Sequence, residues 1–288
     1  MKTFAEISEK YATLEKSKIV LIPVPYDNTQ TWKKGSKKGP KAFLSASKHM
    51  ELYDIETDSE VYKRGIYLSS PIVNSSISSK KMIQKVYNET KKYLFKKKFV
   101  TLIGGDHSIS IGSIRAFGEK YPNLSILHMD AHADLRPVYK KNPYSHACSM
   151  HEASKKYPLI QIGIRSMDLL EKKYFQKGNV FYMQEIQKND FWMQKAIHKL
   201  SKNVFISIDI DVFDPSIAPS TGTPEPGGLL WYSTLKFFKK VFKKKKIIGF
   251  DIVELLPNKK ESSTDFLAVK LFYKLLSYKY ELITTSFV

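Results

Sequence analysis

Aspartate and histidine residues cluster at three points of this sequence, and each cluster directly follows a short apolar run. The six candidates are His107, Asp130, His132, Asp134, Asp209 and Asp211. Four carboxylates brought close together would repel one another and could not all stay ionised without cations among them. Two divalent cations would resolve that repulsion and could activate a bridging hydroxide as a nucleophile. A set rich in aspartate and free of thiolate favours Mn²⁺ over a structural zinc ion.

The spacing within these clusters suggests how the ligands could face one another. The runs that precede them are Val100–Ile103, Ser125–Met129 and Val204–Ile208. In an extended chain, residues two apart leave the same side, so Asp130, His132 and Asp134 would form a three-pronged clamp. Taken singly, each residue could instead be a strand-end cap or a buried polar group, whereas three clusters behind three apolar runs favour a metal site.

Short apolar runs alternate with amphipathic stretches along the whole chain. Six clear strand candidates and two weaker ones are Ile19–Ile22, Val100–Ile103, Ser125–Met129, Leu159–Ile164, Val204–Ile208, Ile247–Ile252, Gly65–Leu68 and Val180–Tyr182. Helical spacing is found over Lys80–Phe95, Ser110–Lys120, Trp192–Leu200, Ser233–Lys243 and Ser263–Tyr278. This alternation predicts one α/β domain over residues 1–288, a three-layer α/β/α sandwich with a mainly parallel sheet of about eight strands. Ligands of such sheets bind at the carboxyl ends of the strands, which is where the acidic clusters lie.

Composition excludes several other classes of protein. The chain has 288 residues, 42% of them hydrophobic, and a single cysteine, Cys148, which rules out a disulfide framework. No apolar stretch reaches the length of a membrane span, and the first 18 residues lack a secretory h-region, so we expect a cytoplasmic protein with no membrane partner. The formal net charge is +19, but only four of the 47 basic residues are arginines. Because base readout relies on arginine, we do not expect a nucleic-acid partner and interpret the charge as a solvated lysine surface.

Several motifs together resemble the ureohydrolase superfamily of arginases and agmatinases. They are GGDHS at 104–108, DAHADL at 130–135, QIGIRS at 161–166, SIDIDVFDPSIAPSTGTPEPGG at 207–228 and DIVELLP at 251–257, with PYDNTQ…KGSKKGP at 25–40 before them. The order and spacing of these motifs carry the resemblance, which covers roughly residues 20–275 and implies an arginase-like fold.

The resemblance also implies roles for individual residues. One Mn²⁺ would be held by His107, Asp130, Asp134 and Asp209, and a second by Asp130, His132, Asp209 and Asp211. Glu254 would bind the guanidinium of the substrate. His146 would shuttle the proton that the leaving amine needs, although Asp134 is the alternative donor and the sequence does not decide between them. The resemblance further implies a homotrimer or homohexamer.

The substrate implied is a small guanidino compound cleaved to urea and an amine. Arg136 stands where the arginase pattern has an asparagine, and the SHA and TGTPEPGG segments resemble the agmatinase branch. Agmatine, cleaved to putrescine and urea, is therefore the first expectation. N1-aminopropylagmatine, guanidinobutyrate and arginine remain alternatives, as does a different class, a metal-binding homologue without turnover. His128, inside an apolar run, is expected to be a core residue with no catalytic role.

Overall fold

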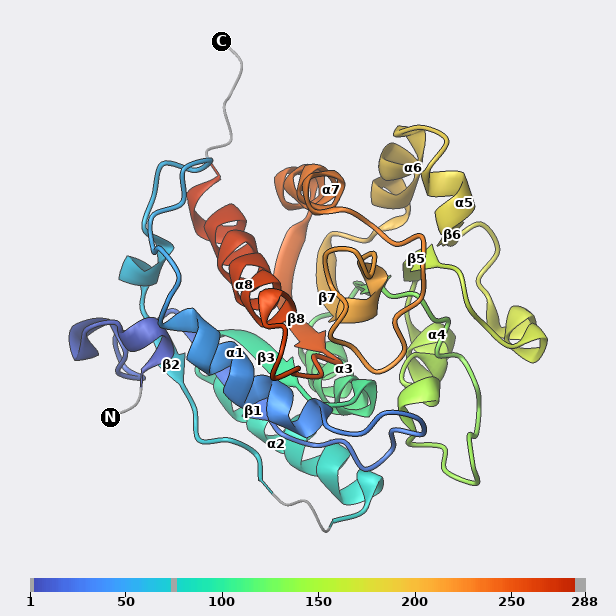
Figure 1. Cartoon of the computed structure of the whole chain (residues 1–288), viewed down its shortest axis with the longest axis horizontal. Coiled ribbons are helices and arrows are strands. Elements are labelled where there is room, and N and C mark those ends of the chain that lie inside the picture. The colour runs from blue at the N-terminus through green and yellow to red at the C-terminus, as the bar shows by residue number, and fades with distance from the viewer. Residues whose placement is uncertain (1–2, 74–76, 283–288) are drawn as a thin grey trace.

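One parallel sheet runs through the centre of the protein, in a computed structural model that describes residues 3–73 and 77–282 (Figure 1). Its eight strands all run parallel, in the order β2-β1-β3-β8-β7-β4-β5-β6. Their bounds are β1 Ile19–Val24, β2 Ile66–Leu68, β3 Phe99–Gly104, β4 Leu124–Met129, β5 Leu159–Ile164, β6 Val180–Tyr182, β7 Asn203–Asp209 and β8 Lys246–Val253. All eight apolar runs of the sequence therefore form strands, and the predicted sheet is confirmed.

Helices cover both faces of this sheet. They are α1 Gly39–Ser47, α2 Ser79–Phe95, α3 Ser110–Lys120, α4 His151–Lys156, α5 Met183–Ile186, α6 Phe191–Lys199, α7 Trp231–Lys244 and α8 Ser263–Glu281. Short 3-10 helices are η1 Phe4–Glu6, η2 Glu9–Tyr11, η3 Ser36–Lys38, η4 Val61–Arg64, η5 His107–Ile109, η6 His146–Cys148, η7 Leu169–Tyr174 and η8 Ile210–Val212. Side chains of α1, α5, α6, α7 and α8 join one core cluster, and those of α2, α3 and α4 join the other. The three-layer sandwich is confirmed.

Strand β1 shows how one sequence serves both layers. All six of its residues are buried. Ile19 and Leu21 pack into the cluster beneath α1 and α8, whereas Val20, Ile22 and Val24 pack into the cluster beneath α2 and α3. Because successive strand residues face opposite sides, a strand covered on both faces must be apolar throughout, which is why these strands appear as continuous apolar runs.

The predicted helices are present with small shifts of their ends, but three helices were missed. The missed helices are α1, α4 and α5, which have nine, six and four residues. Helices α4 and α5 are too short for an apolar periodicity to be told from chance. Helix α1 is fixed by tertiary packing instead, since Phe43 meets Phe272 of α8 edge-on with ring centroids 5.4 Å apart.

The strand order brings four strand ends together at the middle of the sheet. Strands β3, β8, β7 and β4 are neighbours, although β3 and β4 come early in the chain and β7 and β8 come late. Their carboxyl ends carry His107, Glu254, the pair Asp209 and Asp211, and the cluster that begins at Asp130. Residues scattered over about 150 positions of the sequence thus share one edge of the sheet.

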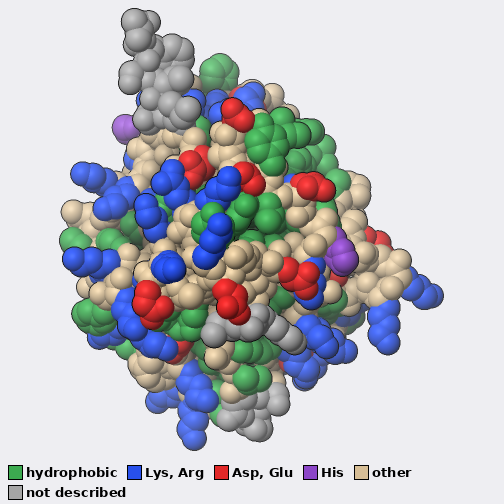
Figure 2. All heavy atoms as spheres, turned by 90° about the vertical axis from the view of Figure 1, so that its left-hand side faces the viewer, with side chains coloured by type: hydrophobic (Ala, Val, Ile, Leu, Met, Phe, Trp, Pro, Cys, Tyr) green, Lys and Arg blue, Asp and Glu red, His purple; other side chains and the backbone are tan. Residues whose placement is uncertain are grey.

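Basic side chains are widely distributed over the surface. Figure 2, which looks onto the left-hand side of Figure 1, shows Lys and Arg side chains over most of that face with acidic side chains among them. Within residues 3–73 and 77–282, no helix combines the length and the hydropathy that a membrane crossing needs.

A buried carboxyl group in the first turn of α8 makes stability depend on pH. Asp265 is 9% exposed, and its Oδ1 has no hydrogen-bond partner. Burial, with a smaller contribution from the charge of Glu261, raises the pKa of Asp265 from 3.8 to about 6. The folded protein therefore holds this proton more tightly than the unfolded chain does. The stability that the proton provides is complete below about pH 4 and is lost as the pH rises through about 6.

Replacing Asp265 with Asn should stabilise the protein at pH 8 and change little at pH 4. The neutral amide removes the cost of ionising a buried group, so we expect a gain of up to about 2 kcal/mol at pH 8. Thermal unfolding of both proteins at the two pH values measures the difference. A loss of stability at pH 8 would instead mean that the N-terminus of α8 stabilises the anion.

Candidate metal centre

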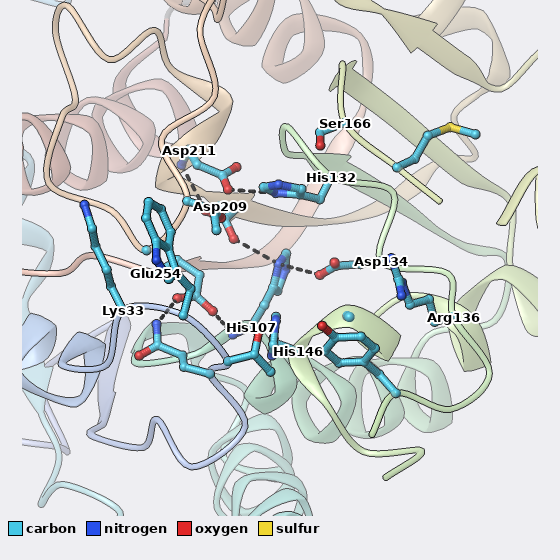
Figure 3. A pocket seen from close by; sticks show the side chains of 18 of the residues that line it. Lys33, His107, His132, Asp134, Arg136, His146, Ser166, Asp209, Asp211 and Glu254 are labelled. Carbon is cyan, nitrogen blue, oxygen red and sulfur yellow. Dashed lines mark hydrogen bonds and ion pairs between the residues drawn. The ribbon is translucent and has the colours of Figure 1, made fainter. Parts of the chain in front are cut away.

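His107 stands at the centre of three carboxylates at the carboxyl edge of the sheet. Its Nδ1 lies 3.1 Å from Asp130 Oδ2, 3.3 Å from Asp134 Oδ2 and 3.3 Å from Asp209 Oδ2. The side chain is 1% exposed, and no hydrogen bond satisfies its Nδ1. Figure 3 shows the imidazole pointing between Asp134 and Asp209. The structure thus brings together all four residues of the first predicted metal site.

A chain of hydrogen bonds behind His107 fixes which nitrogen faces the carboxylates. Ser207 Oγ donates to Asp251 Oδ1 at 2.7 Å and lies 3.0 Å from His107 Nε2. Because the hydroxyl proton goes to Asp251, Ser207 must accept from Nε2–H. Burial opposes protonation of His107, but its close contacts with Asp130, Asp134 and Asp209 raise its pKa well above the ordinary value. A cation bound among these carboxylates would take the place of that proton at Nδ1.

Removing the hydroxyl of Ser207 should loosen this histidine. We expect Ser207→Ala to weaken metal binding by about 10- to 100-fold, since outer hydrogen bonds orient ligating histidines. Calorimetric titration of the metal-free protein with Mn²⁺ measures the affinity. Ser113→Ala, which removes another hydroxyl donor to Asp251, is the matched control. Equal affinities for wild type and Ser207→Ala would show that packing alone orients His107.

A second cluster lies beside the first. His132 Nδ1 lies 2.9 Å from Asp211 Oδ2 and 3.5 Å from Asp130 Oδ1. Asp130 therefore contributes one oxygen toward each histidine, as expected of a ligand shared between two ions. Three of the four residues of the second predicted site are in mutual reach, and Asp209, the fourth, is joined to Asp211 by a backbone hydrogen bond from Asp211 N to Asp209 Oδ1 of 2.9 Å.

The reason predicted for this convergence, two residues on one side of an extended chain, is wrong. Asp209 is the last residue of β7 and caps η8, which contains Asp211, so the chain between them is coiled. Asp134 adopts a positive φ of 53° in the loop after β4. Here the carboxylates accept from the backbone N–H group two residues further along the chain, as at His132 N to Asp130 Oδ1, 2.6 Å. Side chain-to-backbone bonds of this kind favour turns over strands.

The carboxyl groups of the cluster differ in how readily they ionise. Burial, followed by the charges of Asp211 and Asp130, raises the pKa of Asp209 well above its ordinary value. Burial also opposes ionisation of Asp130, yet the neighbouring imidazoles of His128 and His107 hold the pKa of this carboxyl well below its usual range. Carboxylates at these distances cannot all be ionised unless cations lie among them. The unsatisfied Nδ1 of His107 and this crowding fit a pair of divalent cations.

Glu254 forms the floor of the site next to His107. Its Oε1 accepts from His107 N at 2.9 Å, and its Oε2 accepts from Gln30 Nε2 at 2.5 Å. The backbone of Glu254 has a positive φ of 63° and donates to Gly105 O at 2.8 Å, which turns the side chain back over the end of β3. Burial, with the charge of Asp106, raises the pKa of Glu254 well above its ordinary value. A bound cation, such as a guanidinium, would favour its ionised form.

His146 lines the same pocket, which has a volume of about 280 Å³. Its Nδ1 lies 3.3 Å from the hydroxyls of both Thr29 and Ser145, so Nε2 is the nitrogen left for exchange with a substrate. Asp134 lines the pocket as well, and its Oδ2 accepts from Ser149 Oγ at 2.9 Å. The structure places both candidate proton donors within reach of one ligand (Figure 3).

The mouth of the pocket is aromatic and basic, but its arginine is paired. Trp32 and Tyr139 line it, whereas Tyr144, which lies two residues before His146, does not. The guanidinium of Arg136 lies 4.8 Å from the ring centroid of Tyr139, 3.5 Å from Asp168 Oδ2 and 3.8 Å from Glu171 Oε2. A substrate carboxylate would have to compete with these two acids for Arg136.

Sequence reasoning missed residues that hold the ligands in place. His128 is buried, as expected, but it also contacts a proposed metal ligand: its Nε2 lies 2.8 Å from Asp130 Oδ2. Gln161 Nε2 donates to the other ring nitrogen of His128 at 3.0 Å and to Ala133 O at 2.8 Å. His128 therefore carries its proton on Nε2 and donates it to Asp130. Its position two residues before Asp130 was the available signal.

Two further residues, Arg165 and Asp106, stabilise the loops that carry the proposed metal ligands. Arg165 donates to the carbonyls of Asp211 at 2.6 Å and Glu225 at 2.9 Å, which ties the ligand turn to the segment after it. Asp106 stabilises the loop that carries His107: it accepts from Ser108 N at 3.1 Å and Thr29 N at 2.9 Å.

Comparisons with known proteins agree with this geometry. A family model described as the arginase family matches residues 17–277. An N(1)-aminopropylagmatine ureohydrolase of Synechocystis sp. is 35% identical over 96% of this chain and 94% of its own, and one of Thermus thermophilus is 34% identical over 94% and 93%. Among solved structures, the agmatine ureohydrolase of Thermoplasma volcanium superposes with a TM-score of 0.86 at 27% identity, covering 98% of this chain and 95% of that one.

Proposed function

The chain belongs to the arginase family, and on that premise we propose that it is a metal-dependent ureohydrolase that cleaves N1-aminopropylagmatine, or else agmatine, to urea and an amine. The observation that supports this most directly is His107 Nδ1, unsatisfied and within 3.3 Å of three carboxylate oxygens, beside the buried Glu254.

Two Mn²⁺ ions are the proposed cofactors. His107, Asp130, Asp134 and Asp209 would hold one, and Asp130, His132, Asp209 and Asp211 the other. The donors are mostly carboxylates with one imidazole for each ion and no thiolate, a set that suits Mn²⁺. When bound, the ions would neutralise the carboxylates and, by lowering the pKa of water, supply a nucleophile at neutral pH.

Glu254 is proposed to hold the guanidinium. A guanidinium is planar and has only donors, and a carboxylate accepts two of its N–H groups side by side. The carboxylate of Glu254 is already held at both oxygens, by His107 N and Gln30 Nε2, so it does not need to reorganise when the substrate enters. This fixed geometry would present the central carbon of the substrate to the metal cluster.

The amine that leaves must gain a proton, and His146 is the proposed donor. The half-buried His146 has its Nδ1 held by hydroxyls and lies on the pocket wall, where its Nε2 can exchange protons with both the product and solvent. Asp134 remains the alternative donor, and its engagement with Ser149 and His107 argues for a structural and ligating role instead.

The choice of substrate rests on the relatives and on the mouth of the pocket. Relatives that are 35% and 34% identical are named for N1-aminopropylagmatine, which favours that compound over agmatine, the first expectation from the sequence. Arg136 is paired with Asp168 and Glu171, so the mouth offers no unpaired arginine for the carboxylate of guanidinobutyrate or arginine. Trp32 and Tyr139 could pack along an aliphatic, cationic tail.

Urea release by the Mn²⁺-loaded protein tests the proposal. The four compounds are N1-aminopropylagmatine, agmatine, guanidinobutyrate and arginine, and His146→Ala should lower kcat by about 100-fold or more on the preferred one. His198→Ala, at an exposed position of α6, is the matched control. Urea from guanidinobutyrate or arginine alone, the two compounds that carry a carboxylate, would overturn the substrate assignment. No urea from any of the four, with two Mn²⁺ bound, would overturn the activity.

A further inference from the structure

A second concave region lies at the opposite edge of the sheet from the metal centre. It has a volume of about 550 Å³ and is formed where strands β1, β3 and β8 begin. Its lining includes seven lysines, Lys16, Lys18, Lys96–Lys98, Lys246 and Lys279, and we refer to it as the lysine groove. Since β1, β3 and β8 are adjacent, segments far apart in the sequence bring their lysines to one place.

Lysine is concentrated in this groove beyond its high overall frequency. The chain contains 43 lysines in 288 residues, which would place about two among the fourteen residues of the lining, where seven are found. Glu15 is the one acidic residue among those fourteen. None of the seven lysines forms an ion pair with a residue of the described part of the chain. Elsewhere on the surface many lysines are paired, as in Lys91 with Glu119.

Two of these lysines are fixed in place without a counter-ion. Lys98 Nζ donates to Ser17 O at 2.6 Å, and Lys279 Nζ donates to Ile247 O at 2.8 Å. Both side chains are half-buried. Burial, with the charge of Lys246, lowers the pKa of Lys279. Half-buried ammonium groups held by carbonyls alone leave a positive field in the groove that an anion would neutralise.

We propose that the lysine groove binds a small polyphosphate anion, such as the phosphate chain of a nucleotide. The starts of three adjacent strands, each about 4.8 Å from the next, spread the lysines over about 10 Å, which suits two or three linked phosphates. Lysine recognises phosphate as a point charge, without the planar fork that arginine uses for bases. Tyr121 and Tyr280 also line the groove and could contact an attached base.

One groove lysine can be removed with an expected gain in stability. Lys97 adopts a positive φ of 57° directly after α2, where its N–H donates to Leu94 O at 2.9 Å. That left-handed position at the end of a helix is one that glycine favours. Lys97→Gly therefore removes a charge without endangering the fold. Lys96 and Lys246 are exposed and unpaired, so Gln at either position should also be tolerated.

Binding of inorganic tripolyphosphate to the full-length protein tests the site. We expect Lys96→Gln/Lys97→Gly/Lys246→Gln to weaken binding by about tenfold or more, because three of seven facing ammonium groups are lost. The matched control is Lys80→Gln/Lys81→Gln/Lys85→Gln, which removes the same charge from the exposed side of α2 and should bind like wild type. Protection of Lys96, Lys97 and Lys246, but not Lys81, from an amine-reactive label would locate the anion.

The results of these binding measurements distinguish the proposed anion site from its alternatives. Binding lost only in the groove variant supports the site, and tighter binding of ATP than of tripolyphosphate would indicate a nucleotide as the source of the phosphates. Absence of binding at physiological salt, or equal loss in both triple variants, would overturn the proposal. Tighter binding of a single-stranded RNA, with the same dependence on the groove lysines, would overturn it in favour of a nucleic-acid surface.

Discussion

Asp209→Asn is expected to abolish urea release and, at the same time, to stabilise the metal-free protein. Asp209 Oδ2 lies 3.3 Å from His107 Nδ1, and its Oδ1 accepts from Asp211 N, so this side chain stands between the two proposed ions. Without its charge, neither ion keeps its full set of ligands. We expect bound Mn²⁺ to fall from two per chain to one or none, and activity to fall by more than about 1,000-fold.

The gain in stability follows from the same crowding. Asp209 is buried against Asp211 and Asp130, and burial with these two charges raises its pKa well above the ordinary value. In Asp209→Asn a neutral amide replaces one of these three carboxyl groups, so the repulsion among them decreases. The melting temperature without metal should therefore rise, while the further rise that Mn²⁺ gives the wild type should disappear.

Metal analysis and melting curves with and without Mn²⁺ measure both effects. Asp190→Asn, which breaks a surface ion pair with Lys236, is the matched control and should leave metal content and activity unchanged. If Asp209→Asn kept two Mn²⁺ ions and the activity of the wild type, the proposed sharing of this residue would be wrong.

Glu254→Gln should lower kcat/KM for the guanidino substrate by about 1,000-fold while leaving the metal ions bound. Both oxygens of Glu254 accept hydrogen bonds from the protein, from His107 N and from Gln30 Nε2. Glutamine has a single acceptor oxygen, so its amide group would meet a donor on one side and the N–H groups of the guanidinium on the other. The charge that pairs with the substrate is lost as well.

Steady-state urea release, with metal content measured on the same sample, isolates this effect from loss of the cluster. Glu119→Gln is the matched control, because Glu119 pairs with Lys91 at the surface and does not line the pocket. We expect less than about a tenfold change there. A Glu254→Gln protein within tenfold of wild type would exclude Glu254 as the group that positions the guanidinium.

The sequence by itself determined the sheet, the layer architecture and the six candidate metal ligands. Strands buried on both faces must be largely apolar, so they appear in the sequence as short apolar runs, and the acidic clusters follow where those runs end. Val100–Ile103 followed by His107 is one such case. The parallel arrangement then places all these ends at one edge, so candidate ligands could be named without knowing the order of the strands.

Only the tertiary structure decided how those residues meet and what holds them. The strand order β3-β8-β7-β4 depends on long-range pairing that no local pattern specifies. His128 and Ser207 lie inside apolar runs, where a buried polar side chain looks the same in sequence whether it only packs in the core or also forms a hydrogen bond with a proposed metal ligand. Their roles depend on the partners across the sheet, Asp130 and Gln161 for His128, and Asp251 and His107 for Ser207. A hydrogen bond is a relation between two positions in space, so it becomes visible only when the chain is folded.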